Sequence, residues 1–183
     1  MSYFGEDWDE NEFPLAYLIT IRTYGTWLHG DERSSVDRHD RSNKFGAPKL
    51  RPSSIMERKM AEAMKSPVFT FDRKQRKIVD IAIREVSDHR GYFLHALNVR
   101  SNHGHIVVHA RSKPEPIANA FKSYATRKLK AENALENPEQ RVWSRGRSRR
   151  YLWKEESVAA AVNYVLYCQG DIEFEEWYDS GRK

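Results

Sequence analysis

Two histidines separated by a single residue, His103 and His105, form the pattern in this sequence with the clearest capacity for metal chemistry. They begin an apolar segment, residues 103–110, that is typical of a β-strand. Side chains alternate in face along a strand, so both imidazoles point the same way, with Cβ atoms roughly 6.5 Å apart. At that spacing they could converge on one divalent cation. The alternative is a pair of structural histidines without a metal.

Three tyrosines are candidate nucleophiles toward phosphorus, because a phenol can attack a phosphate that a metal ion polarises. Tyr164 and Tyr167 lie on a helix expected near the end of the chain. Tyr124 lies on an earlier helix rich in lysine and arginine, which is better suited to phosphate contacts than to chemistry. Gln169 offers a carbonyl oxygen, a hard ligand that could complete a magnesium site.

The elements that must position these residues follow from hydrophobic periodicity and turn signals. Strands are expected at residues 14–24, 92–99 and 103–110, with a tight turn at 100–102. A hairpin is expected from residues 142–143 and 149–153, around Arg145, Gly146 and Arg147. Helices are expected at residues 57–65, 73–89, 114–131 and 157–169.

The order β-α-β-β-α-(β)-α predicts an α+β fold, in which a ferredoxin-like antiparallel sheet has helices packed on it. For the helix at residues 73–89, Asp72 is the expected N-cap and Gly91 the expected stop. Its apolar stripe is expected to consist of Ile78, Ile81, Ala82 and Val86.

Composition narrows the class of protein. The chain has 183 residues and a mass of 21.5 kDa, which suits one domain. With 39% apolar and 31% charged residues, it is too apolar for a disordered chain and too charged for a membrane protein. The single cysteine, Cys168, excludes an internal disulfide framework and a multi-cysteine zinc site. An acidic N-terminus without an apolar core argues against a secretory signal, so a cytoplasmic protein is expected.

The net charge of +5 is unevenly distributed. We divide the chain into an acidic segment at residues 1–13, a body at residues 14–170 and an acidic tail at residues 171–183. The body carries 29 basic and 16 acidic residues, which favours a polyanionic partner over an ordinary surplus of lysine. Between Arg141 and Lys154, basic residues alternate with aromatic ones that could stack on unpaired bases. The candidate DNA contacts are Lys122, Arg127, Lys128, Arg145, Arg147, Arg149 and Arg150.

Across roughly residues 14–170, these motifs together resemble the single-tyrosine HUH transposases, the insertion-sequence-200-like and REP-associated tyrosine transposases. Residues 101–105, Ser-Asn-His-Gly-His, match the Asn-His-x-His core of that family. The opening strand with residues 23–28, the basic helix at residues 121–127, and the segment from residue 143 to Tyr164 resemble its other motifs.

The resemblance implies a homodimer in which His103, His105 and Gln169 hold Mg²⁺ or Mn²⁺. It implies that Tyr164 attacks a phosphodiester of single-stranded DNA at hairpin-flanked sites, leaving a 5′-phosphotyrosine and a free 3′-OH. In the cell, such a protein would associate with the nucleoid when bound to DNA.

Two positions depart from the family pattern. Gly104 stands where a bulky apolar residue is usual, and the third ligand usually lies four residues after the tyrosine, where this chain has Cys168. Two other functions therefore stay open. One is a non-catalytic hairpin-DNA-binding protein on the same fold, and the other is a basic RNA-binding or protein-interaction module with structural histidines.

Overall fold

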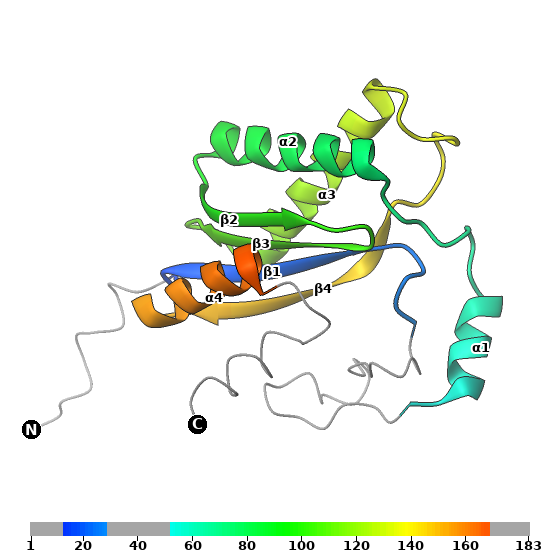
Figure 1. Cartoon of the computed structure of the whole chain (residues 1–183), viewed down its shortest axis with the longest axis horizontal. Coiled ribbons are helices and arrows are strands. Elements are labelled where there is room, and N and C mark those ends of the chain that lie inside the picture. The colour runs from blue at the N-terminus through cyan, green and yellow to red at the C-terminus, as the bar shows by residue number, and fades with distance from the viewer. Residues whose placement is uncertain (1–12, 29–51, 169–183) are drawn as a thin grey trace, which may run out of the picture.

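One four-stranded antiparallel sheet forms the centre of the computed structural model, which describes residues 13–28 and 52–168 (Figure 1). Across the sheet the strand order is β2-β3-β1-β4, so β3 lies between the consecutive strands β1 and β2. This split arrangement confirms the expected ferredoxin-like α+β fold. The strands are β1 (Ala16–Thr23), β2 (Phe93–Val99), β3 (His103–His109) and β4 (Trp143–Leu152).

Helices cover both faces of the sheet. Apolar side chains of α2 and α3 pack against one face, and α4 packs against the other (Figure 1). None of the nine residues of α1 is buried, and this helix lies away from the sheet in Figure 1. The helices are α1 (Ser54–Glu62), α2 (Arg73–Arg90), α3 (Pro114–Ala131) and α4 (Glu155–Tyr167).

Strand β1 contributes to both cores, which explains its nearly continuous apolar sequence. Tyr17, Ile19 and Ile21 belong to the core under α2 and α3. The alternate residues Ala16 and Leu18 belong to the smaller core under α4. We call these two sides of the sheet the α2/α3 face and the α4 face. Within the described residues, no helix is both long and apolar enough to cross a bilayer.

Helix α2 begins and ends where the sequence predicts. Asp72 accepts a hydrogen bond from the Gln75 amide, and Gln75 accepts one from the Asp72 amide, which completes a capping box. Gly91 ends the helix in the left-handed region at φ 66°. The predicted apolar stripe was wrong at Ile81, which is 45% exposed, whereas Ile83 is fully buried.

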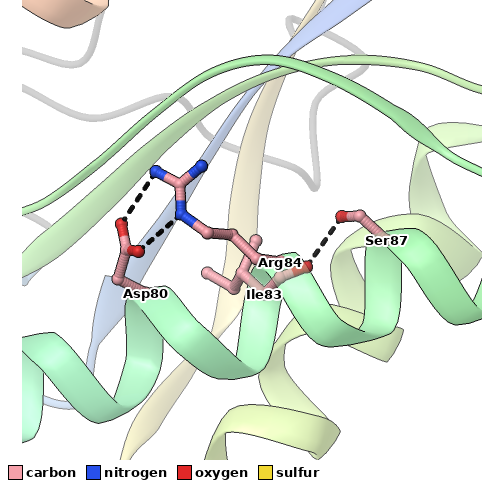
Figure 2. A network of polar contacts seen from close by, with 4 residues as sticks. All are labelled: Asp80, Ile83, Arg84 and Ser87. Atoms are coloured by element: carbon pink, nitrogen blue, oxygen red, sulfur yellow. Dashed lines mark hydrogen bonds and ion pairs between the residues drawn. The ribbon is translucent and has the colours of Figure 1, made fainter.

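Polar contacts join successive turns of α2, on its exposed side at Arg84 and on its buried side at Ser87 (Figure 2). The Arg84 guanidinium donates to the Asp80 carboxylate at 2.7 Å, and the Ser87 hydroxyl donates to the Ile83 carbonyl at 2.7 Å. An exposed pair such as Asp80 and Arg84 adds only a few tenths of a kcal/mol. The stability of the helix therefore comes mainly from the apolar face packed on the sheet.

The expected hairpin at residues 142–153 is wrong, because β4 is one continuous strand along β1. The register shifts between Ile21, which pairs with Arg147, and Thr23, which pairs with Trp143. Lys122 of α3 donates from Nζ to the Ser144 and Gly146 carbonyls at 2.8 and 2.7 Å. These bonds satisfy backbone groups where the ladder is irregular, so the chain continues as a strand instead of turning back.

Helix boundaries differ from the expectation at two other places. Helix α1 begins at Ser54 because the Ser53 side chain accepts a hydrogen bond from the Met56 amide at 3.3 Å. Helix α4 begins at Glu155, two residues earlier than expected, and extends to Tyr167. The acidic segment and the acidic tail lie almost entirely outside the described residues.

Candidate active site

His103 and His105 lie side by side on the α4 face of β3. Val107, two residues further along the same strand, packs in the core beneath α4, which fixes the direction of this alternation. The two imidazole centroids are 4.6 Å apart, with an interplanar angle of 73°. The predicted shared orientation of the two rings is therefore confirmed.

Thr20 of β1 orients the ring of His105. The two residues are direct partners in the β1–β3 register, and Thr20 Oγ1 lies 2.8 Å from His105 Nδ1. A hydroxyl can donate or accept, so either neutral tautomer satisfies this bond. A cation bound at Nε2 requires the tautomer in which Nδ1–H donates to Thr20.

Asn102 orients the ring of His103. Asn102 Oδ1 lies 2.7 Å from His103 Nδ1, and an amide oxygen only accepts, so Nδ1 carries the proton and the lone pair lies on Nε2. The Asn102 backbone carbonyl accepts from the amide and the hydroxyl of Thr23, at 2.9 and 3.0 Å. These two hydrogen bonds therefore anchor Asn102 to Thr23, at the end of β1.

Electrostatics keep His105 neutral. Burial is the main cause that lowers the pKa of His105 to about 3, and the electrostatic influence of the neighbouring His103, Arg22 and Arg100 acts in the same direction. A neutral imidazole is the form that binds a metal ion. The site therefore presents a metal-binding nitrogen at any pH near neutrality.

Tyr164 of α4 lies over this pair. Its ring stands edge-on to His105, with centroids 5.5 Å apart and an interplanar angle of 75°, and only 3% of the residue is exposed. Asn98 of β2, the register partner of His105 on its other side, donates from Nδ2 to the Val165 carbonyl at 3.0 Å. Thr20 thus orients the imidazole, and Asn98 ties α4 to the sheet beside Tyr164.

The other candidate tyrosines occupy different environments. Tyr124 packs against the core on the α2/α3 face, on the far side of the sheet from the histidines, with the Arg127 guanidinium 4.2 Å from its ring centroid. Tyr167 lies one helical turn beyond Tyr164 and is 79% exposed. Of the three, the ring of Tyr164 is therefore the one in contact with the histidine pair.

The described residues provide two of the ligands that a divalent cation would need, His103 and His105. Both histidines have an Nδ1 bonded to an oxygen, which is the outer-shell arrangement usual for metal-binding imidazoles. Among residues 13–28 and 52–168, no third His, Cys, Asp or Glu joins them in a metal-binding group. Cys168 instead lies 3.6 Å from Asn163 Oδ1, and the predicted ligand Gln169 lies outside the described residues. Imidazole binds several divalent metals, so this pair does not select one.

Sequence reasoning missed Thr20, Asn98 and Asn102 as supporting residues. Thr20 acts on His105 across the β1–β3 register and Asn98 on the backbone of α4, whereas Asn102 acts on its neighbour in sequence, His103. A signal was available for two of them, because Thr20 and Asn98 are polar residues flanked on both sides by apolar residues of their strands. A buried polar side chain needs a partner, and here the partners are His105 and the backbone of α4.

The candidate DNA contacts of α3 already have partners inside the fold. Lys122 binds the β4 carbonyls described above. Lys128 lies 2.8 Å from Glu85 of α2, and Arg127 stacks on Tyr124. These three side chains stabilise the α2/α3 face, whatever further contacts they make.

The basic residues of β4 are divided between the two faces. Arg147 and Arg149 form ion pairs with Glu115 of α3, at 3.4 and 3.1 Å. Arg150 is the register partner of Leu18, so it lies on the α4 face with the histidines. Arg145 is exposed near the register shift.

The aromatic residues of β4 also have different roles. Trp143 is partly buried, and its indole donates to the Lys122 carbonyl and to Thr126 Oγ1, both at 3.1 Å. Tyr151 and Trp153 are 43% and 53% exposed, and their rings stack with an interplanar angle of 12°. Trp143 therefore belongs to the core, whereas Tyr151 and Trp153 form an exposed stacked pair.

Comparison with known proteins identifies solved structures that are similar to this chain. The chain is similar to the structure described as "Structure of the REP associates tyrosine transposase bound to a REP hairpin", with 13% identity and a TM-score of 0.46, over 90% of this chain and 70% of the other. It is also similar to a protein of Deinococcus radiodurans R1 provisionally described as a transposase, with 15% identity and a TM-score of 0.42, over 84% and 89% of the two chains. No curated protein matches the chain.

The family described as "Transposase IS200 like" matches residues 60–165. This range includes the strand that carries His103 and His105 and the helix that carries Tyr164. Since it spans more than half of the sequence, the chain belongs to the IS200-like transposase family.

Proposed function

We propose that this protein is a metal-dependent endonuclease and strand transferase for single-stranded DNA, with Tyr164 as its nucleophile. The observation that carries the proposal is the contact of the Tyr164 ring with His105, at a centroid distance of 5.5 Å. Family membership supports transposase chemistry in general, and this contact supports the assignment of residues.

His103 and His105 would hold a divalent cation, Mg²⁺ or Mn²⁺, through their Nε2 atoms. When bound, such an ion withdraws negative charge from a phosphate and orients it. Thr20 and Asn102 keep both rings in the ligating tautomer. Gln169 remains the proposed third ligand.

In the proposed step, the Tyr164 phenol loses its proton to water and its oxygen forms a bond to phosphorus. The bond from phosphorus to the 3′ oxygen breaks, and that oxygen takes up a proton from water to give a free 3′-OH. The DNA beyond the break stays joined to the protein as a 5′-phosphotyrosine. Attack by another 3′-OH reverses these changes and joins the strands, so no external energy source is needed.

The proposed partner is hairpin or single-stranded DNA on the α4 face. Arg150 places positive charge on this face. Tyr151 is the register partner of Tyr17 and therefore lies on the α2/α3 face, so the exposed stacked pair of Tyr151 and Trp153 would offer its rings to unpaired bases at the outer strand β4. The REP-associated transposase named above is described as bound to a REP hairpin, which agrees with this class of ligand.

We also propose that the protein works as a homodimer, as the family resemblance implies. In the described sheet the outer strands are β2 and β4. An outer strand presents backbone groups that can pair with a second chain. The mass of the protein in solution, measured by light scattering, tests this proposal.

A second candidate function is hairpin-DNA binding without cleavage. The observation that favours it is the 3% exposure of Tyr164, because a nucleophile must reach its phosphate. This function predicts tight binding of hairpin DNA, with no covalent product at any metal concentration.

A denaturing gel separates the two functions. Single-stranded oligonucleotides from the DNA flanking the gene, labelled at the 5′ or 3′ end, are incubated with protein in the presence of Mn²⁺, Mg²⁺ or EDTA. We expect a metal-dependent band in which protein is joined to the 5′ end of the downstream fragment. Tyr164→Phe should abolish it, whereas the matched controls Tyr167→Phe and Tyr124→Phe should retain it. Tight binding without this band would favour the non-catalytic function.

A further inference from the structure

A positively charged side chain, Arg22 of β1, lies beside the histidine pair. Arg22 and His103 are direct partners in the β1–β3 register, as Thr20 and His105 are two residues away. Directly opposed residues of an antiparallel pair point to the same face of the sheet. Arg22 therefore shares the α4 face with both histidines.

The charge of Arg22 acts on the site itself. Its guanidinium carries a permanent positive charge, and the register places that charge beside the histidine pair. The site thus combines two metal-binding imidazoles with a permanent cation.

Trp27 holds the guanidinium of Arg22. The Arg22 Cζ atom lies 3.5 Å from the centroid of the Trp27 ring, which is a close cation–π contact. This contact uses the flat face of the guanidinium, whereas its N–H groups donate in the plane of that group. Stacking on Trp27 therefore fixes the plane in which Arg22 can donate hydrogen bonds.

A tight turn at residues 23–26 brings the Trp27 side chain beside Arg22. Gly25 adopts a φ of 75°, a conformation that residues with a side chain rarely adopt. The Thr26 hydroxyl donates to the Thr23 carbonyl at 3.1 Å across the turn. Thr23 in turn binds the carbonyl of Asn102, the residue that orients His103. One chain of contacts thus links the Arg22–Trp27 stack to the proposed metal ligand.

We propose that Arg22 contacts a non-bridging oxygen of the scissile phosphate, and that Trp27 positions its guanidinium for this contact. The inference rests on the proposed function and adds a residue to it. Negative charge at the phosphoryl oxygens must be balanced during displacement at phosphorus, and a fixed guanidinium is a donor suited to that task. Arg22 makes no covalent bond and transfers no proton.

The test compares two substrates that differ in charge at the cleaved position. One carries the normal phosphodiester, and the other carries a methylphosphonate, in which a neutral methyl group replaces a non-bridging oxygen. On the phosphodiester, Arg22→Gln should slow adduct formation by about 100-fold or more. Arg22→Lys should recover part of that loss because it keeps the charge without the planar fork. On the methylphosphonate, wild type and Arg22→Gln should differ by no more than about 3-fold, since the charge that Arg22 balances is absent.

Three outcomes would overturn the inference. An equal loss for Arg22→Gln on both substrates would show that Arg22 acts on the fold or on Trp27 alone. An unchanged rate on the phosphodiester would remove Arg22 from the reaction while leaving Tyr164 in place. The absence of any adduct with wild-type protein would remove the proposed function, and this inference with it.

A second readout applies if the wild-type protein does not cleave the methylphosphonate. The two phosphorothioate diastereomers at the same position distinguish the two non-bridging oxygens. Arg22→Gln should change the ratio of their cleavage rates by about 10-fold or more, because one specific oxygen loses its donor. An unchanged ratio would overturn the inference. Thermal unfolding of each variant serves as the control for folding.

Discussion

The ring of Tyr164 stands edge-on against the ring of His105, with centroids 5.5 Å apart. A helix near the end of the chain and a central strand of the sheet thus meet at two aromatic side chains. The neighbouring residues Thr20 and Asn98 hold the two partners of this contact.

Replacing Thr20 by valine removes the oxygen bonded to His105 Nδ1 and keeps the shape of the side chain. We expect the affinity for Mn²⁺ to fall by about 10-fold to 100-fold, as for other losses of a ligand's hydrogen-bond partner. Isothermal titration calorimetry measures it, and Thr20→Ser, which keeps the hydroxyl, is the matched control. Equal Mn²⁺ affinity for Thr20→Val and wild type would mean that this bond does not support a metal site.

Replacing Asn98 by alanine removes the hydrogen bond from Nδ2 to the Val165 carbonyl. The loss of about 1 kcal/mol should loosen the end of α4 that carries Tyr164. Amide hydrogen exchange in peptides from residues 158–167 should therefore become about 5-fold faster. Asn163→Ala is the control, because Asn163 is exposed on the same helix. Similar exchange in both variants would contradict the assigned role of Asn98.

Replacing Gly104 by alanine should stabilise the protein. A Cβ atom at Gly104 would lie 3.6 Å from Ile21 Cγ1 and 3.8 Å from the Asn98 carbonyl oxygen, which are ordinary contacts. Removing a glycine from a strand reduces the entropy of the unfolded chain, so we expect a gain of about 0.5–1 kcal/mol in the free energy of unfolding. Urea denaturation measures it.

The contrasting variant is Gly104→Leu. Gly104 is buried, so a long side chain would press against Ile21 and should cost about 1–3 kcal/mol. A loss of stability in Gly104→Ala would show that the space beside Ile21 is smaller than described.

The stability of the metal-free protein should depend on pH through His105. Its pKa is about 3 in the folded protein, against about 6.5 in the unfolded chain. Between these values only the unfolded chain binds the proton, so the stability present above pH 6.5 is lost as the pH falls. His95, whose pKa is lowered by burial and by His109, acts in the same direction.

A matched variant isolates the contribution of His105. In EDTA, the difference in unfolding free energy between wild type and His105→Gln should shrink by about 2 kcal/mol from pH 7 to pH 5. His95 is present in both proteins, so its titration cancels. A difference that does not change with pH would contradict a neutral buried His105.

Much of this architecture could be predicted from the sequence. Alternation along β3 placed His103 and His105 on one face, and capping residues located both ends of α2. The hairpin at β4 was predicted wrongly because the strand is continued by Lys122, a residue of α3 that is distant in sequence. Local turn signals cannot report a tertiary contact of this kind.

Only the principal residues of the candidate site could be predicted from the sequence. His103, His105 and Tyr164 follow from motif order, whereas Thr20 and Arg22 depend on the register between β1 and β3, which are far apart in sequence. Asn98 depends on the packing of α4 against β2. The seven basic residues proposed for DNA binding show the same limit. Composition could not reveal that Arg147 and Arg149 share Glu115, or that Arg150 lies on the other face.

The central claim is that Tyr164 is the residue that becomes joined to DNA, and mass spectrometry tests it most directly. Wild-type protein is incubated with Mn²⁺ and the cleavable oligonucleotide, the adduct is digested with nuclease and trypsin, and the modified peptide is fragmented. The proposed function predicts a nucleotide phosphate on Tyr164, on the helix that packs over His105. A phosphate on Tyr167 or on any other residue, or the absence of a modified peptide, would contradict it.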